Sequence, residues 1–226
     1  AAVALGAEEV EFDIWSTSDG VLVSSHDSTL DRVSNGTGKI YEHTYAELLE
    51  LDFGVKHGEK FRGLKIPTFE EILQKFACHV VMNIHIKSFN NVDPMDEAYL
   101  KKIIATIRKY DCVKYVYFMT GNDTLMRQLG ALAPDIARCV GGGNARDLVV
   151  ERAIEMGCEK VQFMRKHFSK EKIDLAHAHG IRCNIFWSDD PAEAAQWLDW
   201  GMDVILTNDY QRMADALGDR VKTGFI

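Results

Sequence analysis

The sequence lacks several features that would assign it to particular classes of protein. Its 226 residues include only 4 prolines and 17 glycines, which excludes collagen-like chains and proline-rich disordered chains. No apolar run approaches the roughly 20 residues that a membrane-spanning helix needs. Lysine and arginine form no block, and 26 of them against 34 acidic residues give a net charge of −8. We therefore expect neither a nucleic acid nor an anionic membrane as partner.

Cysteine is also scarce, and its pattern excludes two kinds of structural site. The 5 cysteines are widely spaced, each lies in an apolar stretch, and no Cys-x-x-Cys pair occurs. This pattern predicts buried free thiols in a reducing, cytoplasmic location rather than disulfides or a structural zinc knot. The sequence also contains no Gly-x-Gly-x-x-Gly turn after a strand and no Gly-x-Ser-x-Gly elbow. Their absence disfavours a dinucleotide-binding fold and a serine hydrolase.

Short apolar segments alternate with amphipathic segments along most of the chain. The apolar segments predict strands at Glu9–Ile14, Val80–Ile86, Tyr115–Met119, Ile136–Val140, Lys160–Met164, Arg182–Trp187 and Val204–Thr207. Helix start signals lie between them, among them the capping box of Thr68 and Glu71 and the Asp190-Pro191 pair. Helix stops are expected at Gly130, Gly157, Gly180 and Gly201. This alternation predicts an α/β protein with a parallel sheet.

Two architectures fit such a sheet, an eight-stranded (β/α)8 TIM barrel and an open doubly wound sheet. We favour the barrel, as a single domain over residues 1–226. Residues 1–6 are typical of the end of a helix, so we expect the first barrel strand to lie upstream and to be absent from this sequence. Residues 19–67 are too long for a simple connection, and we expect them to form a small insertion over the carboxyl end of the barrel.

Two carboxylates within the first strand indicate a metal site. Glu11 and Asp13 flank Phe12, and side chains two residues apart on a strand share one face. In a barrel strand, that face is the lumen, and two neighbouring carboxylates repel each other unless a cation lies between them. The alternative is a strand with one solvent-exposed face.

A second polar group follows in the next predicted strand, where Asn83, His85 and Lys87 share a face. The two polar neighbours favour His85 as a ligand or catalyst over a histidine that is merely packed in the core. Lys87 suits either a phosphate oxygen or an ion pair with the carboxylates.

The remaining candidates carry weaker signals. His26, followed by Asp27, ends a strand-like run, and Trp187 ends a predicted strand, where it forms either a pocket wall or rim packing. His177 and His179 lie two apart on a predicted helix and are expected on a solvated face. The run of three glycines at 141–143 predicts a flexible turn, with anion binding by its N–H groups as the alternative.

Several ordered stretches resemble the glycerophosphodiester phosphodiesterase family. They are Ala4–Ile14, Ser18–Gly38, Lys65–Glu71, Asn83–Lys87 and Val204–Asn208, so the resemblance runs from near residue 1 to about residue 210. It implies a (β/α)8 barrel with a small insertion after the second strand. It also implies one divalent metal ion and the cleavage of glycerophosphodiesters to glycerol 3-phosphate and an alcohol.

The resemblance also implies roles for individual residues. Glu11 and Asp13 match metal ligands, and His26 matches one of two catalytic histidines that act as general acid or base. Lys87 matches a catalytic lysine that helps to hold the phosphate, and Trp187 matches an aromatic residue of the substrate pocket.

The sequence departs from the family pattern at two places. The His-Arg-Gly of the family's first strand, which supplies the other catalytic histidine, has no match here. Where the family has Glu-Ile-Lys, this chain has His85-Ile-Lys87, so His85 stands at the position of the third metal ligand. Three carboxylates suit Mg²⁺ or Ca²⁺, whereas an imidazole shifts the preference toward Mn²⁺, Zn²⁺ or Fe²⁺. Protonated His85 and Lys87 could instead replace part of the metal's charge.

These observations predict a metal-dependent hydrolase of lipid and glycerol metabolism, acting on small glycerophosphodiesters with histidine acid–base catalysis. One alternative is a phosphodiesterase for a larger lipid or polymer. Another is a catalytically weak barrel that binds a phosphorylated ligand, which the histidine at position 85 would favour. The expected partner is a small-molecule phosphodiester, with a homo-oligomer possible and no transmembrane segment.

Overall fold

The computed structural model describes residues 2–87, 94–143 and 145–218. The chain divides into two compact units, which we name unit 1 (residues 1–10, 80–83 and 114–226) and unit 2 (residues 11–79 and 84–113). The chain passes from one unit to the other within two of its strands. The expectation of a single domain over residues 1–226, with an insertion over the carboxyl end of a barrel, remains a prediction.

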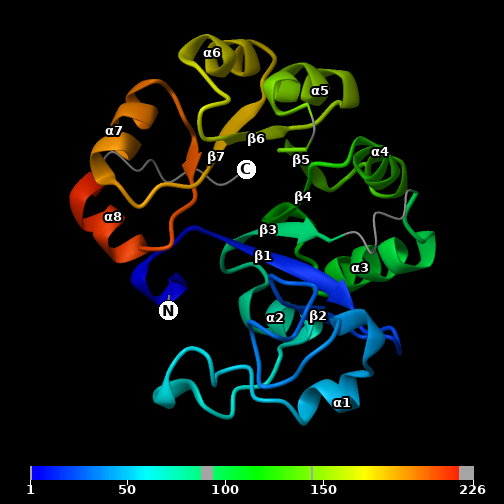
Figure 1. The fold of residues 1–226 in the computed structure, drawn as a ribbon. Coiled ribbons are helices and arrows are strands. Elements are labelled where there is room, and N and C mark those ends of the chain that lie inside the picture. The colour runs from blue at the N-terminus through cyan, green and yellow to red at the C-terminus, as the bar shows by residue number, and fades with distance from the viewer. Residues whose placement is uncertain (1, 88–93, 144, 219–226) are drawn as a thin grey trace. The chain divides into compact units, whose positions relative to one another are not determined.

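Strands and helices alternate as the sequence predicts (Figure 1). The strands are β1 (Glu9–Ser16), β2 (Leu22–Ser24), β3 (Val81–Ile86), β4 (Val116–Thr120), β5 (Ala137–Gly141), β6 (Lys160–Met164), β7 (Arg182–Phe186) and β8 (Val204–Ile205). The α-helices are α1 (Tyr45–Leu49), α2 (Phe69–Phe76), α3 (Glu97–Lys109), α4 (Asp123–Leu132), α5 (Val149–Met156), α6 (Lys170–Ala178), α7 (Pro191–Asp199) and α8 (Tyr210–Leu217). Every predicted strand is present, although β8 has two residues where four were expected.

The strands form one hydrogen-bonded sheet in the order β2-β1-β3-β4-β5-β6-β7-β8. From β4 to β8 each strand is parallel to the next, which confirms the parallel sheet expected from alternating strands and helices. The eighth strand of this sheet is β2, which pairs antiparallel with β1 through Ile14 and Ser24. The polypeptide turns back on itself between them at residues 17–21, so this pair is a hairpin.

The core of unit 1 lies between the sheet and its helices. Val161 and Phe163 of β6 are fully buried in one apolar cluster with Ile173 of α6 and Trp197 of α7. Gln162, the residue between them, is buried on the opposite face of β6. Figure 1 shows α4, α5 and α6 beside β4, β5 and β6, each helix next to the strand that it follows. β6 is therefore buried on both faces, with apolar side chains toward the helices and the polar Gln162 on the other face.

Helix boundaries confirm most of the local signals and correct one of them. Thr68 accepts a hydrogen bond from the Glu71 N–H while Glu71 accepts from the Thr68 N–H, and Asp190 caps α7. Gly157, Gly180 and Gly201 have the positive φ expected of helix stops. The stop predicted at Gly130 is wrong because α4 continues to Leu132. A Cβ at position 130 would lie 2.3 Å from Nη1 of Arg138, so close packing explains this glycine.

Residues 19–67 build a core of their own within unit 2. Val23 of β2, Leu48 of α1 and the loop residue Leu30 are fully buried in one cluster with Trp15 of β1. Thr44 and Glu47 form a capping box at the start of α1. The segment is therefore a folded layer, although its regular structure is limited to one short strand, one short α-helix and two single turns of 3-10 helix.

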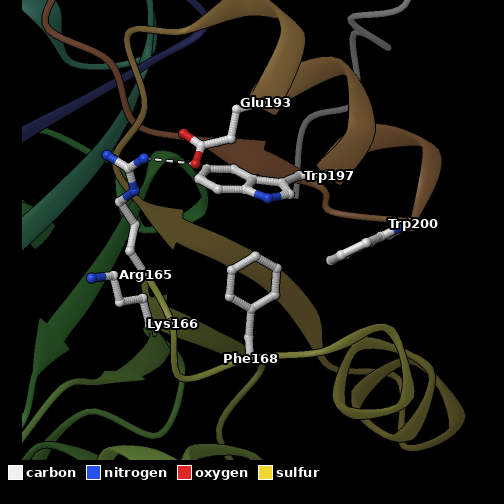
Figure 2. A pocket seen from close by; sticks show the side chains of 6 residues that line it. All are labelled: Arg165, Lys166, Phe168, Glu193, Trp197 and Trp200. Atoms are coloured by element: carbon white, nitrogen blue, oxygen red, sulfur yellow. Dashed lines mark hydrogen bonds and ion pairs between the residues drawn. The ribbon is translucent and has the colours of Figure 1, made fainter.

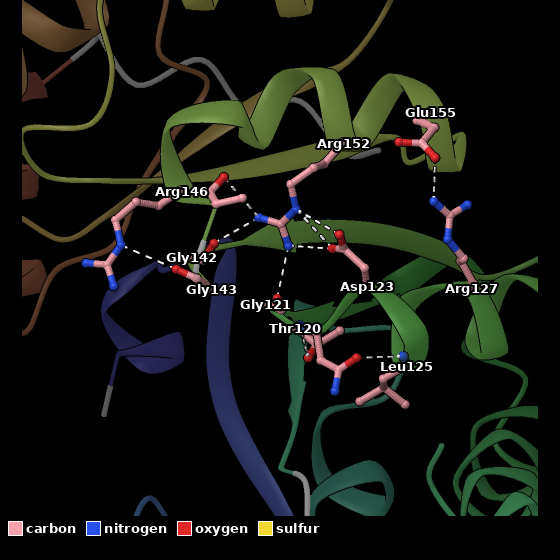
Figure 3. Close-up of polar contacts among 12 residues, drawn as sticks. Thr120, Gly121, Asp123, Leu125, Arg127, Gly142, Gly143, Arg146, Arg152 and Glu155 are labelled. Carbon is pink, nitrogen blue, oxygen red and sulfur yellow. Dashed lines mark hydrogen bonds and ion pairs between the residues drawn. The ribbon is translucent and has the colours of Figure 1, made fainter. Parts of the chain in front are cut away.

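The glycine turn after β5 is packed closely against the loop after β4, and its flexibility remains a prediction. Arg152 of α5 donates hydrogen bonds to the carbonyl oxygens of Gly142 and Gly121, and Figure 3 shows both contacts. A Cβ on Gly143 would lie 2.4 Å from the Gly121 oxygen. The two loops therefore meet backbone to backbone, which only glycine permits.

The cysteines are free, as expected, but one of them is not buried. Four of the five are buried, whereas Cys78 is exposed and has a positive φ of 62° after α2. In the described ranges, no helix is long and apolar enough to cross a membrane.

Candidate active site

The site begins on β1, where the alternation of side chains separates carboxylates from apolar residues. Phe12 faces α2, with its ring centroid 6.3 Å from that of Phe69. Glu11 and Asp13 therefore lie together on the other face of the strand. The Asp13 side chain is 5% exposed and the Glu11 side chain 26% exposed. This confirms the arrangement predicted for this strand.

The end of β3 brings an imidazole and an ammonium group to Asp13. Oδ1 of Asp13 lies 2.9 Å from Nδ1 of His85 and 2.8 Å from Nζ of Lys87. The same His85 nitrogen lies 4.0 Å from Oε1 of Glu11. The strands are held in this register by the Lys87 N–H, which donates to the carbonyl oxygen of Ile14 at 3.3 Å. Lys87 therefore forms the ion pair that was one of its two expected roles.

The two carboxylates have opposite pKa shifts, although burial acts to raise the pKa of both. Burial and the nearby charge of Asp13 raise the pKa of Glu11 to about 7, although Lys87 and His26 act in the lowering direction. Burial also opposes ionisation of Asp13, but the contacts and charges of His85 and Lys87 outweigh it and lower its pKa. The negative charge of Asp13 is therefore compensated by its neighbours, whereas that of Glu11 is not.

These side chains fit a divalent cation. Ligand atoms of Glu11, Asp13 and His85 all lie within 4.8 Å of one another. Oδ1 of Asp13 is buried and has no well-aligned hydrogen bond, despite its close ion-pair contacts. A cation between Glu11 and Asp13 would also supply the charge whose absence raises the pKa of Glu11. The donor set of two carboxylates and one imidazole suits Mn²⁺ or Zn²⁺ better than Ca²⁺.

His26 is placed by the hairpin that β1 and β2 form. The indole N–H of Trp15 donates to the carbonyl oxygen of Ser25 at 3.0 Å, and the Ser24 N–H donates to Pro67 at 3.0 Å. These bonds fix the backbone immediately before His26. The imidazole itself is 68% exposed, so it is open to a substrate.

A bidentate ion pair orients the His26 ring. Arg32 donates to both carboxylate oxygens of Asp27, at 2.6 and 2.7 Å, and Nδ1 of His26 lies 2.8 Å from Oδ1 of Asp27. These contacts lower the pKa of Asp27, with Arg32 the larger cause. With Nδ1 donating to Asp27, Nε2 is the ring nitrogen left for proton transfer.

Sequence reasoning noticed Asp27 but missed Arg32, which completes this arrangement. Arg32 follows His26 by six residues in a turn region without periodicity. Only the folded turn brings its guanidinium back to Asp27, so periodicity gave no signal.

The other predicted residues belong to unit 1. Trp187 follows β7, is 37% exposed, and lies with its ring 5.9 Å from the guanidinium carbon of Arg165. Figure 2 shows the nearby pocket, where Arg165 also pairs with Glu193 at 2.6 Å. The lining residues are Arg165, Lys166, Phe168, Glu193, Trp197 and Trp200. Trp187 is not among them, so its role in a substrate pocket remains a prediction.

Asn83, the first residue of the polar triplet on β3, lies in the interior of the protein. It is fully buried in unit 1, where its Nδ2 lies 3.4 Å from Oε1 of Gln162. It therefore belongs to the polar interior of unit 1, while His85 and Lys87 belong to unit 2.

Comparison with known sequences agrees with this geometry. The sequence model of the "Glycerophosphoryl diester phosphodiesterase family" matches residues 1–212. A glycerophosphodiester phosphodiesterase of Caldanaerobacter subterraneus is 30% identical over 211 residues, covering 92% of this chain and 85% of its own. The corresponding Bacillus subtilis protein is 27% identical and covers 89% of this chain and 74% of its own.

Solved structures share the fold. An Oleispira antarctica phosphodiesterase, solved with the product sn-glycerol-3-phosphate, superposes with a TM-score of 0.84 at 24% identity, over 95% of this chain and 86% of its own. An Agrobacterium tumefaciens glycerophosphodiester phosphodiesterase gives 0.79 at 22% identity, over 95% and 89%. The fold is thus the α/β barrel that the alternating strands and helices predict. The match over residues 1–212 shows that the chain belongs to the glycerophosphoryl diester phosphodiesterase family.

Proposed function

We propose that this protein hydrolyses small glycerophosphodiesters to glycerol 3-phosphate and an alcohol, using a divalent metal ion and histidine acid–base chemistry. Membership of the family supports the reaction class. The observation that carries the proposal is the convergence of Glu11, Asp13 and His85 on one point, with Lys87 beside it. A phosphodiester anion resists attack, so a site of this kind must neutralise its charge.

Glu11, Asp13 and His85 are the residues that would hold the metal ion. Once bound, the ion would polarise a phosphoryl oxygen and make the phosphorus more electrophilic. The ligands are positioned by two adjacent strands rather than by loops, which favours a defined geometry.

Lys87 and His26 supply what a metal ion does not. The Lys87 ammonium group, now paired with Asp13, suits a non-bridging phosphate oxygen when substrate binds. Nε2 of His26 takes or gives a proton at the attacking or leaving oxygen, while Asp27 holds Nδ1. Nδ1 thus keeps its proton, and only Nε2 gains and loses one as the ring alternates between imidazole and imidazolium.

A second candidate function is a barrel that binds a phosphorylated ligand with little or no turnover. The specific observation in its favour is that His85 and Lys87 already contact Asp13, so protein cations partly neutralise the site. In that case phosphate would bind without added metal.

The test is glycerol 3-phosphate release from a glycerophosphodiester by the metal-stripped chain, with Mg²⁺, Ca²⁺, Mn²⁺ and Zn²⁺ added back in turn. We expect at least one ion to restore activity, and D13N to abolish the response. The matched control is E97Q, an exposed carboxylate on α3 whose partner is Lys101. Binding of glycerol 3-phosphate without turnover, whichever ion is added, would favour the second candidate. Absence of both binding and turnover would reject the site.

A further inference from the structure

A second group of metal-binding side chains lies in unit 1. It consists of His177 on α6, Cys183 on β7 and Asp203 immediately before β8. One ligand atom from each lies within 4.8 Å of the other two. His177 is exposed, as expected for a solvated helix face, and its Nε2 also lies 2.9 Å from Oδ2 of Asp203. The fold brings it back onto the amino end of the sheet.

The Asp203 carboxylate is positioned by a backbone hydrogen bond and by a nearby arginine. The Cys183 N–H donates to Oδ2 of Asp203 at 2.7 Å, and Nε of Arg182 lies 4.0 Å from Oδ1. The Asp203 N–H in turn donates to the Cys183 carbonyl oxygen at 2.9 Å. Metal ligands in proteins are commonly oriented by hydrogen bonds from neighbouring groups that do not themselves bind the metal. The Cys183 N–H and Arg182 have this relation to the Asp203 carboxylate.

The three donors form a set that selects for particular ions. Thiolate and imidazole are soft and borderline ligands that favour Zn²⁺ and similar ions over Mg²⁺ and Ca²⁺. The Cys183 side chain is fully buried, whereas His177 is 39% and Asp203 26% exposed. An ion could therefore enter from the solvent side and keep a water molecule as its fourth ligand.

We propose that His177, Cys183 and Asp203 bind one divalent transition-metal ion of the zinc type through a cysteine thiolate. Binding deprotonates the Cys183 thiol, and its proton passes to solvent, so no oxidant or reductant takes part. Burial and Asp203 raise the pKa of the free thiol, so the metal-free protein carries the neutral form. The ion joins α6, β7 and the segment before β8.

The contact between His177 and Asp203 also has a simpler explanation, a structural hydrogen bond, which the test must distinguish from metal binding. Without an ion, the hydrogen bond between His177 and Asp203 still ties α6 to the segment before β8. A merely structural pair would not involve the sulfur atom of Cys183. Cobalt(II) distinguishes the two cases because a thiolate ligand gives an intense sulfur-to-metal charge-transfer band, which oxygen and nitrogen ligands do not.

The experiment titrates the reduced, metal-stripped full chain with Co²⁺ and records this band. We expect one equivalent in the wild type and none in C183S. The matched control is C78S, which removes the exposed cysteine that is most open to adventitious metal and should keep the full band. H177N should weaken Co²⁺ binding at least about tenfold, since even outer-contact partners of metal ligands contribute that much.

Some results would overturn the proposal. No charge-transfer band in the wild type, or an equal band in C183S, would show that Cys183 is not a ligand. If C183S fails to fold, the test relies on H177N instead. A Co²⁺ affinity of H177N equal to that of the wild type would reject the site. Zn²⁺ should also raise the melting temperature of the wild type, and should raise it less in H177N.

Discussion

At the scale of single residues, position 85 is one of the two departures from the family pattern. His85 occupies the place where the resemblance implies a glutamate, and its Nδ1 contacts Asp13 at 2.9 Å. The substitution replaces a hard oxygen donor with an imidazole and removes one negative charge from the site. If the proposed site binds a metal ion, we expect the choice of metal to depend on this residue.

The first prediction concerns H85E. A third carboxylate should raise activity with Mg²⁺ or Ca²⁺ relative to Mn²⁺ or Zn²⁺ by about tenfold or more, because these ions prefer oxygen ligands. The measurement is the ratio of kcat/KM values for metal-stripped enzyme reloaded with each ion. A ratio unchanged from the wild type would mean that position 85 does not ligate the metal. H85Q, which keeps the size but adds no charge, serves as the control.

The second prediction concerns His26. H26N should lower kcat by about 10²–10⁴-fold with little change in KM, because it removes the group that transfers the proton. H57N is the matched control, since His57 is exposed in the same unit. R32L should lower kcat less than H26N does, because Asp27 still contacts the ring when Arg32 is lost. Equal kcat values for H26N and the wild type would remove His26 from the mechanism.

At the scale of elements, loops at the carboxyl ends of strands are tied to one another in pairs. Asp189, after β7, accepts from the Thr207 hydroxyl at 2.8 Å and from the Asn208 N–H at 2.7 Å, after β8. Arg152 performs the same task for the loops after β4 and β5 (Figure 3). Charged groups that bond several backbone atoms position such loops more firmly than loop sequence alone would.

The third prediction follows from the pKa of Asp189. Burial acts to raise it, but the bonds from Asn208 and Thr207 prevail and lower it. Its folded-state pKa lies below the unfolded value, so its stabilisation is complete above the unfolded pKa and is lost as pH falls through the folded pKa. D189N should therefore destabilise the protein by about 1–2 kcal/mol at neutral pH and less in acid. Urea unfolding at pH 7 and pH 3 measures this, with D174N as an exposed control.

At the scale of the whole molecule, we expect stability to depend on a buried lysine in unit 1. Lys160 is 1% exposed, and its Nζ lies 3.6 Å from Oε2 of Glu9 and 4.3 Å from the centroid of the Tyr117 ring. The Tyr117 hydroxyl donates to Glu9 and accepts from Asn184. This network links β1, β4, β6 and β7, so its loss should be felt in global unfolding.

The fourth prediction is a double-mutant cycle on this pair. K160M should lower the free energy of unfolding by about 3 kcal/mol, because the partly buried Glu9 carboxylate loses its cation. E9Q combined with K160M should recover much of that loss, since no charge is then left without a partner. Chemical denaturation of the four proteins gives the coupling free energy. Strictly additive effects would contradict the prediction.

The sequence by itself determined the strand–helix order and the pairing of side chains on single strands. Glu11 and Asp13 share a face because side chains alternate on a strand, and Thr68 starts a helix because its hydroxyl caps it. Both are local rules, so they can be applied without knowing the fold. Gly130 is a position where the local rules fail. Its lack of a side chain is explained by contact with Arg138 on the next strand and not by a helix stop.

Only the tertiary structure decided which of these residues meet. His85 and Lys87 reach Asp13 because β3 lies next to β1 in the sheet, although 71 residues lie between positions 13 and 85 in sequence. Arg32 reaches Asp27, and His177 reaches Asp203, because a turn and a helix fold back onto strands. Periodicity reports the face of a residue on its own element but not its partner on another. Contacts between distant segments depend on packing and register, which are properties of the whole sheet.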